Sequence, residues 1–323
     1  MDDAAALLDR VAAGDRRALA RALTRAENGE TSLRTELWRR RAALSGTARR
    51  IGFTGPPGAG KSSLVNALVR EARRRGETVA VLAVDPSSPF GGGAFLGDRI
   101  RFEEHVLDPG VFFRSQASRG NLGGLAETSP DLLDVFALAP FDRVFVETVG
   151  VGQSELEVAR LADLVVVVLS PHAGDVMQAM KSGLIEIGDW FVVNKADLPG
   201  AEAAKNDLLA GLELAQGGME KLARVLLASA TSGAGVPELL DRLDALDAAE
   251  TARRRDLALE RRLDAAVARG LAFLRHRAEL IPLFQAELAS LRDGRVTLED
   301  AKWKLVSAAL TFGQAGGRSE TLP

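Results

Sequence analysis

The chain has no cysteine and only three histidines among its 323 residues. Without thiols, the protein can form neither disulfides nor thiolate metal sites. The histidines, His105, His172 and His276, are scattered through the sequence, so a zinc or nickel site made of protein ligands is not expected. These absences exclude disulfide-stabilised proteins and thiolate-bound metal centres.

Long hydrophobic runs and a large excess of one charge are also absent. The longest apolar run near the middle, Leu164–Leu169, is far shorter than the roughly 18 residues that cross a bilayer. The first residues include two aspartates and lack the basic-then-apolar pattern of an export signal. Lys and Arg number 41 against 44 Asp and Glu, and the net charge of −3 excludes a strongly basic protein that coats nucleic acid. We therefore expect a cytoplasmic globular protein that binds neither membrane nor nucleic acid.

Short β-branched runs, separated by segments of helix length, begin near residue 51. This alternation predicts an α/β protein with a mostly parallel central sheet flanked by helices. Such sheets place their ligand-binding loops at the carboxyl ends of the strands. The expected strands are Ile51–Thr54, Val79–Val84, Val111–Phe113, Arg143–Glu147, Leu164–Leu169, Trp190–Val193 and Val225–Ala228.

Helical patterns flank this region, so we divide the chain into an N-terminal helical segment (1–48), a P-loop domain (49–245) and a C-terminal helical arm (246–323). The first 50 residues carry 11 Arg against 7 Asp and Glu. This basic excess is either a solvated face beside the main domain or a docking surface. In the arm, we expect Pro282 to interrupt one helix and Thr297–Asp300 to cap another. The arm either packs against a second copy or folds back on its own domain.

A phosphate-binding motif follows the first expected strand. The sequence matches GxxxxGK[ST] in the strand–loop–helix setting that the motif requires. The backbone N–H groups of such a loop and the helix N-terminus point at phosphate, Lys61 adds charge near the β- and γ-phosphates, and the Ser62 hydroxyl can ligate Mg²⁺. The motif indicates a nucleoside triphosphate, bound by Gly55, Pro56, Pro57, Gly58, Ala59, Gly60, Lys61, Ser62 and Ser63.

A second motif, NKxD, follows the strand Trp190–Val193 and selects the base. The Asp197 carboxylate can accept hydrogen bonds from N1–H and the 2-amino group of guanine, whereas adenine would leave it unpaired. After the last expected strand comes Ser229-Ala230, where a backbone N–H can meet guanine O6. Only seven residues are lysines, yet two of the seven lie in these two motifs. The sequence therefore favours GTP, with Asn194, Lys195, Asp197, Ser229 and Ala230 around the base.

Two carboxylates, Asp85 and Glu147, stand at the ends of expected strands. Carboxylates at neighbouring strand ends suit Mg²⁺, a hard cation that prefers oxygen ligands. Gly150, just beyond the second strand, is expected to contact the γ-phosphate through its N–H. The sequence thus predicts a magnesium site made of Ser62, Asp85, Asp98 and Glu147.

The glycine-rich stretch 86–101 separates Asp85 from the next strand and is typical of a loop that reorganises when γ-phosphate is lost. Arg101 in this stretch is a candidate for stabilising charge during phosphoryl transfer. We expect catalysis to depend on Lys61, Arg101 and Glu147. Val151 stands where Ras-like enzymes carry a glutamine after the switch glycine, so no water-orienting residue is assigned and slow intrinsic hydrolysis is expected.

Together these motifs resemble the MeaB/ArgK/MMAA family of GTPases. The resemblance covers roughly residues 1–240; it includes Val146–Glu155, in which the long stretch Glu147–Glu155 is specific. The C-terminal helices match only in character. Other similar stretches are Gly55–Ser62, Asp85–Ser88, Gly92-Gly93, Leu96–Asp98, Ser118–Gly120, Leu122–Gly124, Gly174-Asp175 with Gln178 and Lys181, and Val193–Asp197.

The resemblance implies a P-loop GTPase that forms homodimers and serves as a chaperone for adenosylcobalamin-dependent acyl-CoA mutases. Family members couple GTP binding and hydrolysis to loading intact cofactor and discharging damaged cofactor. The partner, methylmalonyl-CoA mutase or a related enzyme, would carry adenosylcobalamin, because this chain has no DxHxxG sequence. An adenosyltransferase is a candidate for a second partner protein. The resemblance also places a partner-sensing switch at Pro171–Lys181, with Asp175, Gln178 and Lys181.

The sequence departs from the family at two places. Pro89-Phe90-Gly91 replaces a Thr-Arg-Thr-like stretch, while His172 and Val176-Met177 replace the usual glycine and Glu-Leu. These changes leave the nucleotide-binding motifs intact, but they leave more than one identity open for the partner protein. The alternatives are a metal-insertion GTPase for nickel or another metal, which the lack of cysteine disfavours, a GTP- or ATP-dependent kinase, and a catalytically inactive nucleotide-binding dimer.

Overall fold

The computed structural model describes residues 3–40, 48–85, 103–105, 107–117, 128–148, 158–172, 174–215, 219–245, 255, 281–292 and 304. The chain divides into two compact units, residues 1–255 and 256–323, and each is considered by itself. Among the described residues, no helix is long and apolar enough to cross a membrane.

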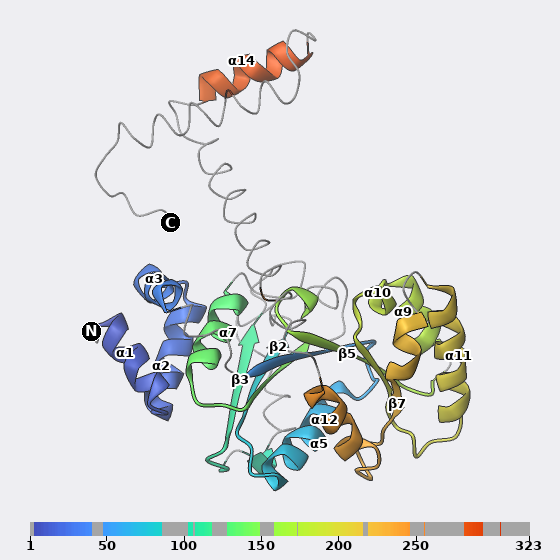
Figure 1. Ribbon diagram of the computed structural model, residues 1–323. Helices are drawn as coiled ribbons and strands as arrows, with labels where there is room; N and C mark the ends of the chain where they lie inside the picture. Colours follow the sequence, from blue (N-terminus) through green and yellow to red (C-terminus); the bar gives the residue numbers. More distant parts are fainter. Residues whose placement is uncertain are drawn as a thin grey trace. The chain divides into compact units, whose positions relative to one another are not determined.

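A seven-stranded parallel sheet forms the centre of the first unit (Figure 1), in the order β3-β2-β4-β1-β5-β6-β7. The predicted α/β fold is therefore confirmed. β1 lies between β4 and β5, and its last four residues are buried. The strands are β1 (Arg49–Thr54), β2 (Val79–Asp85), β3 (Val111–Ala117), β4 (Arg143–Thr148), β5 (Leu164–Leu169), β6 (Trp190–Val193) and β7 (Val225–Leu227).

Helices cover both faces of the sheet and create two apolar cores. Helices α5 (Lys61–Arg74) and α12 (Val236–Asp244) share one core with alternate residues of the strands. The opposite core contains α7 (Ser129–Leu138), α9 (Asp175–Lys181), α10 (Leu184–Ile187) and α11 (Ala201–Leu214). Short 3₁₀ turns lie at Glu103–His105 (η1), Val158–Arg160 (η2) and Met219–Arg224 (η3).

Three N-terminal helices, α1 (Ala4–Ala12), α2 (Arg16–Glu27) and α3 (Thr31–Arg39), pack beside α7 (Figure 1). Their apolar faces join the core on that side of the sheet. Part of the basic excess of this segment holds it in place: Arg34 pairs with Asp131 at 2.8 Å, and Arg16 donates to the backbone oxygens of Pro109 and Val111 at 2.6 and 2.7 Å. These arginines therefore act as structural links to α7 and β3.

In the second unit the structure describes helix α14 (Ile281–Arg292). Pro282 is part of this described helix, and the residues before Ile281, on which the expected interruption depends, lie outside the described residues. Lys304 forms an ion pair with the buried Glu287 of this helix. The expected cap at Thr297–Asp300 lies outside the described residues.

Candidate functional site

The loop Gly55–Gly60 joins the central strand β1 to α5, in the setting expected for a phosphate-binding loop. Its turns require glycine at two positions. Gly55 has φ +139°, and a Cβ there would collide with the backbone of Val168 in β5; Gly60 has φ +87°, and a Cβ there would collide with the Asn194 side chain. The loop is therefore held tightly against its neighbours. Ala59 and Pro56 are buried, whereas Pro57, Gly58 and Ser63 are exposed.

Lys61, the first residue of α5, closes the loop on itself. Its Nζ donates hydrogen bonds to the carbonyl oxygens of Gly55 at 2.7 Å and Pro56 at 3.0 Å. The side chain is buried at 7% exposure, so its charge lies inside the loop. A cation held there, at a helix N-terminus, suits an anionic ligand such as a polyphosphate.

Ser62 and Glu147 bring a hydroxyl and a carboxylate together beside this loop. The Ser62 hydroxyl donates to Glu147 Oε1, and both side chains are buried. Glu147 lies near the end of β4, opposite Phe53 of β1 in the parallel register. These oxygen donors fit Mg²⁺, which binds carboxylate and hydroxyl oxygens next to phosphates. Among the described residues, no cluster of three His, Asp or Glu side chains forms a metal site from protein ligands alone.

Four further residues were predicted for this side of the site. Asp85 is the last residue of β2, one position beyond the Val84–Thr148 pairing with β4. Its backbone therefore ends at the same sheet edge as Glu147. Asp98, Arg101 and Gly150 lie outside the described residues.

Asn194 links the phosphate loop to the loop after β7. Its Nδ2 donates to the carbonyl oxygens of Ala59 at 3.0 Å and Gly60 at 3.2 Å, while its Oδ1 accepts from the backbone N–H of Ala230 at 3.1 Å. Asn194 is 1% exposed. The structure thus brings together three segments that the sequence assigned separately to phosphate and base.

Lys195 and Asp197 complete this arrangement. Lys195 has φ +58°, and its Nζ donates to Gly58 O at 2.7 Å. Asp197 Oδ1 accepts a hydrogen bond from Ser229 Oγ, which in turn accepts from the backbone N–H of Ser232 at 3.1 Å. Ser229 therefore orients the carboxylate that is expected to read guanine.

The predicted switch residues lie at the start and along the exposed face of α9. Asp175 accepts hydrogen bonds from Ser170, at 3.1 Å from its N–H and 2.6 Å from its hydroxyl. Gln178 and Lys181 line a shallow hollow of about 440 Å³ together with Gly174, Met177 and Ser182.

Sequence reasoning missed Ser170, which is fully buried at the carboxyl end of β5. The available signal was a polar residue directly after the apolar run Leu164–Leu169. Its hydroxyl also lies 2.8 Å from His172 Nδ1. Because the hydroxyl proton is donated to Asp175, His172 donates to Ser170 Oγ from Nδ1.

Comparison with known proteins identifies the family of this chain. The family model for the methylmalonyl-CoA mutase-associated GTPase MeaB matches residues 19–274. This chain belongs to the MeaB family. It is a GTPase, and it binds GTP and GDP as members of this family do.

Three individual proteins are similar to this chain. A Pyrococcus abyssi protein with GTPase in its name is 48% identical over 240 residues, which is 73% of this chain and 74% of the relative. The mitochondrial methylmalonic aciduria type A homolog of Mus musculus is 37% identical over 196 residues, 59% of this chain and 47% of the relative. The crystal structure of a LAO/AO transport system kinase superposes with a TM-score of 0.66 at 26% identity and covers 94% of this chain and 96% of that one.

Proposed function

We propose that this GTPase is a chaperone that gates the loading of adenosylcobalamin onto an acyl-CoA mutase, methylmalonyl-CoA mutase or a relative, and protects or reactivates that enzyme. The observation that carries the proposal is the family match over residues 19–274, because the family is described by its association with methylmalonyl-CoA mutase. The name of the mouse relative supports the same client. Adenosylcobalamin would belong to the mutase.

The site residues receive the following proposed roles. The phosphate loop and Lys61 bind the GTP phosphates, and Asp197, oriented by Ser229, accepts the two guanine donors. Mg²⁺, when bound, neutralises phosphate charge. Its proposed ligands are Ser62 and Glu147, which lie in contact, with Asp85 and Asp98. Gly150 is assigned to the γ-phosphate and Arg101 to charge stabilisation in the transition state.

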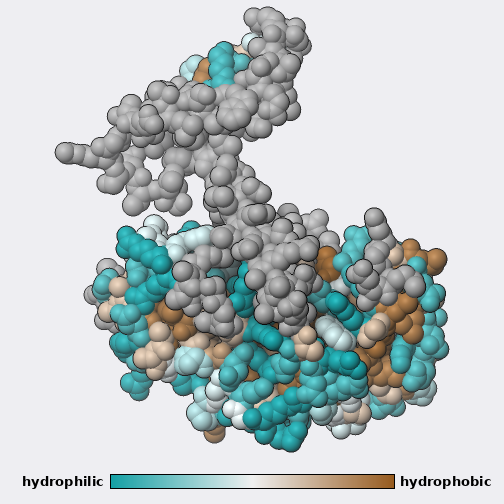
Figure 2. Space-filling view, viewed as in Figure 1, coloured by the Kyte–Doolittle hydropathy of each residue, from teal (hydrophilic) through white to brown (hydrophobic). Residues whose placement is uncertain are grey.

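Helix α9 supplies the proposed surface that senses the mutase. Hydrophobic side chains show on the side of the first unit that carries α9 and α11 (Figure 2), and Met177 is 55% exposed and Leu214 90% exposed there. Lys181 adds a positive charge at the rim of the hollow. An apolar patch edged by polar residues is typical of an interaction surface. In the proposed assembly, residues 246–323 form the homodimer contact, and an adenosyltransferase is the second partner.

The test is GTP hydrolysis, measured as released phosphate, with and without the purified mutase from the same source. We expect the mutase to stimulate a slow basal rate. Lys181→Ala should abolish most of the stimulation and leave the basal rate unchanged, because its side chain lies on the exposed face of α9. Lys205→Ala, on the neighbouring helix α11, is the matched control.

No stimulation of the wild-type protein, with tight GDP binding intact, would contradict the mutase proposal. Equal stimulation of wild-type and Lys181→Ala proteins would instead remove the role assigned to α9. Transfer of labelled γ-phosphate to an acceptor protein or metabolite, in place of free phosphate, would indicate a kinase.

A further inference from the structure

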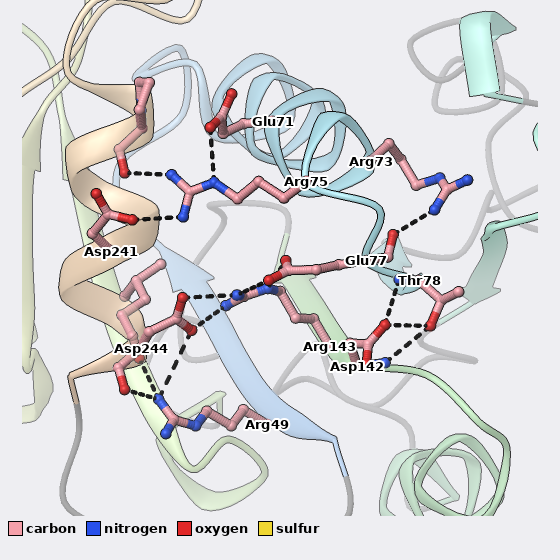
Figure 3. A network of polar contacts seen from close by, with 12 residues as sticks. Arg49, Glu71, Arg73, Arg75, Glu77, Thr78, Asp142, Arg143, Asp241 and Asp244 are labelled. Carbon is pink, nitrogen blue, oxygen red and sulfur yellow. Dashed lines mark hydrogen bonds and ion pairs between the residues drawn. The ribbon is translucent and has the colours of Figure 1, made fainter.

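A network of ion pairs lies at the amino ends of the strands, at the sheet edge opposite the phosphate and base loops (Figure 3). Arg143, the first residue of β4, is at its centre and is 5% exposed. Its guanidinium donates to both oxygens of Glu77 at 2.6 and 2.8 Å and to both oxygens of Asp244 at 2.6 and 2.9 Å. One side chain therefore forms two bidentate pairs, which fix geometry better than single hydrogen bonds do.

The partners of Arg143 belong to elements that carry the nucleotide site at their other ends. Glu77 follows α5, whose first residue is Lys61. Asp244 is the last residue of α12, which follows the loop that contains Ala230. Strand β4 itself runs from Arg143 toward Glu147. Arg143 thus links α5, α12 and β4 at the ends that lie opposite the nucleotide site.

Further polar contacts hold α12 at this edge. Arg49, the first residue of β1, donates to the carbonyl oxygens of Leu243, at 3.0 Å, and Asp244. Arg75, at the end of α5, donates to Asp241 and to Pro237 O (Figure 3). Apolar burial alone is non-directional and permits a helix to slide or rotate, whereas these hydrogen bonds fix its position along the sheet. The apolar residues of α12 in the core are Val236, Leu239, Leu240 and Leu243.

The Arg143 guanidinium keeps its positive charge although it is buried. Burial alone would lower its pKa, but the hydrogen bonds to Glu77 and Asp244 outweigh burial and raise the pKa above its ordinary value. A buried ion pair contributes little net stability compared with apolar packing, although loss of one partner is costly. We therefore expect this network to act mainly by fixing the positions of α5, β4 and α12, and less by raising the free energy of unfolding.

Movement of α12 would reach the base loop directly. Gly235, which precedes α12, has φ +72°, and a Cβ there would collide with Leu227 O, so the junction leaves little space. Within the loop, Ser229 N–H bonds Ala234 O at 2.9 Å, and Ala230 N–H bonds Asn194 at 3.1 Å. Asn194 contacts the phosphate loop in turn.

We propose that Arg143 is a positioning residue that sets the spacing between the phosphate loop and the guanine loop from the opposite edge of the sheet. The inference rests on the nucleotide site proposed above and not on the identity of the client. It assigns no contact between Arg143 and the nucleotide. Its effect passes through α5, β4 and α12.

The test compares Arg143→Met with Arg73→Met in the full-length protein. Arg73 pairs with Asp108 at 2.9 Å and donates to Glu77 O at 2.6 Å near the same end of α5, and these two polar partners lie outside β4 and α12. The readouts are affinity for a fluorescent GDP analogue, its dissociation rate, the kcat and KM for GTP, and Tm. All nucleotide measurements are made well below the unfolding temperature, with folding checked by circular dichroism.

We expect both variants to lower Tm but only Arg143→Met to weaken GDP binding, by about tenfold and mainly through faster dissociation. Arg143→Lys keeps the charge and loses the bidentate geometry, so its affinity should lie between those of the wild type and Arg143→Met. KM for GTP should rise more than kcat falls.

The proposal is overturned if folded Arg143→Met binds GDP within about twofold of the wild type, or if Arg73→Met weakens binding equally. If Arg143→Met does not fold, Asp244→Asn decides by the same criterion, because it retains the side-chain shape and removes one acceptor. Wild-type and Asp197→Asn proteins are measured in parallel. If these two bind GDP equally, the nucleotide-site assignment is at fault and not the role of Arg143.

Discussion

Asp197 carries the choice of base in the proposed site. Its carboxylate accepts the hydroxyl of Ser229, and its neighbour Lys195 closes over Gly58 of the phosphate loop. The remaining lone pairs of the carboxylate are the acceptors that guanine requires and adenine cannot satisfy. The preference for guanine therefore depends on the Asp197 carboxylate, which the Ser229 hydroxyl holds in place.

The Asp197→Asn variant should lose much of its preference for guanine. The amide has a single acceptor oxygen and no charge, so the ratio of GTP to ATP affinity should fall on the order of a hundredfold. The measurement is competition of both nucleotides against a fluorescent GDP analogue. An unchanged ratio would contradict the base assignment.

At the same scale, the two sequence motifs and the loop after the last expected strand contain several residues that the structure brings together. Lys61, Asn194, Lys195 and Ala230 are linked by direct contacts around Gly55–Gly60. Each motif is short and local, so the sequence alone could assign these residues to their loops, and their roles toward the nucleotide stay predictions. Ser170 and Arg143 are not in such motifs, and only their contacts revealed them.

Among the elements, the edge strand β3 shows what a hydrophobic pattern misses. The sequence predicted Val111–Phe113, whereas β3 extends to Ala117. The added part is polar, and Gln116 is fully buried. Gln116 hydrogen bonds Ser129 at 2.8 Å and Thr128 at 3.1 Å, next to the start of α7. Partners from another element therefore satisfy a strand residue that composition places in a loop.

The Glu71 carboxylate, near the end of α5, should make the free energy of unfolding depend on pH in the acid range. Hydrogen bonds from Arg74, with a contribution from Arg75, lower the pKa of Glu71 from 4.5 to about 2. The unfolded chain therefore takes up this proton first as pH falls. The stabilisation is complete above pH 4.5 and is lost as the pH falls toward 2.

The Glu71→Gln variant should unfold with a free energy about 1 kcal/mol lower at neutral pH and should show a flatter pH dependence in that acid range. Urea unfolding at several pH values measures both quantities. Glu202→Gln, at an exposed position of α11, is the control. Parallel pH curves for wild-type and Glu71→Gln proteins would contradict the role of this carboxylate.

For the whole molecule, residues 1–255 contain both apolar cores and every described site residue. Arg255, at the end of this unit, donates to both oxygens of Asp163 at 3.0 and 2.7 Å. Asp163 is 3% exposed and also accepts from the backbone N–H of Arg50. The end of the first unit is therefore attached next to β1.

A protein that ends at Arg255 should fold and bind GDP with an affinity within about twofold of the full-length chain. If residues 246–323 form the proposed dimer contact, it should also be monomeric. Titration with a fluorescent GDP analogue and sedimentation equilibrium measure these properties. A truncated protein that remains dimeric would remove the proposed role of the arm.

A shorter protein that ends at Ala245 is the matched comparison. It loses Arg255 and leaves Asp163 with fewer charged partners, so its unfolding free energy should be lower than that of the longer form by about 3 kcal/mol. Equal Tm values for the two truncated proteins would show that the Arg255–Asp163 pair is not an anchor.

The sequence by itself determined the α/β class, the seven strands and the GTP motifs, because hydrophobic periodicity and glycine-dependent loops are local properties of the chain. Only the tertiary structure decided which distant charges meet. Arg143 is 66 residues from Glu77 and 101 residues from Asp244, and Arg255 is 92 residues from Asp163. With 41 basic and 44 acidic side chains available, many pairings satisfy charge alone, and the order of the strands selects among them.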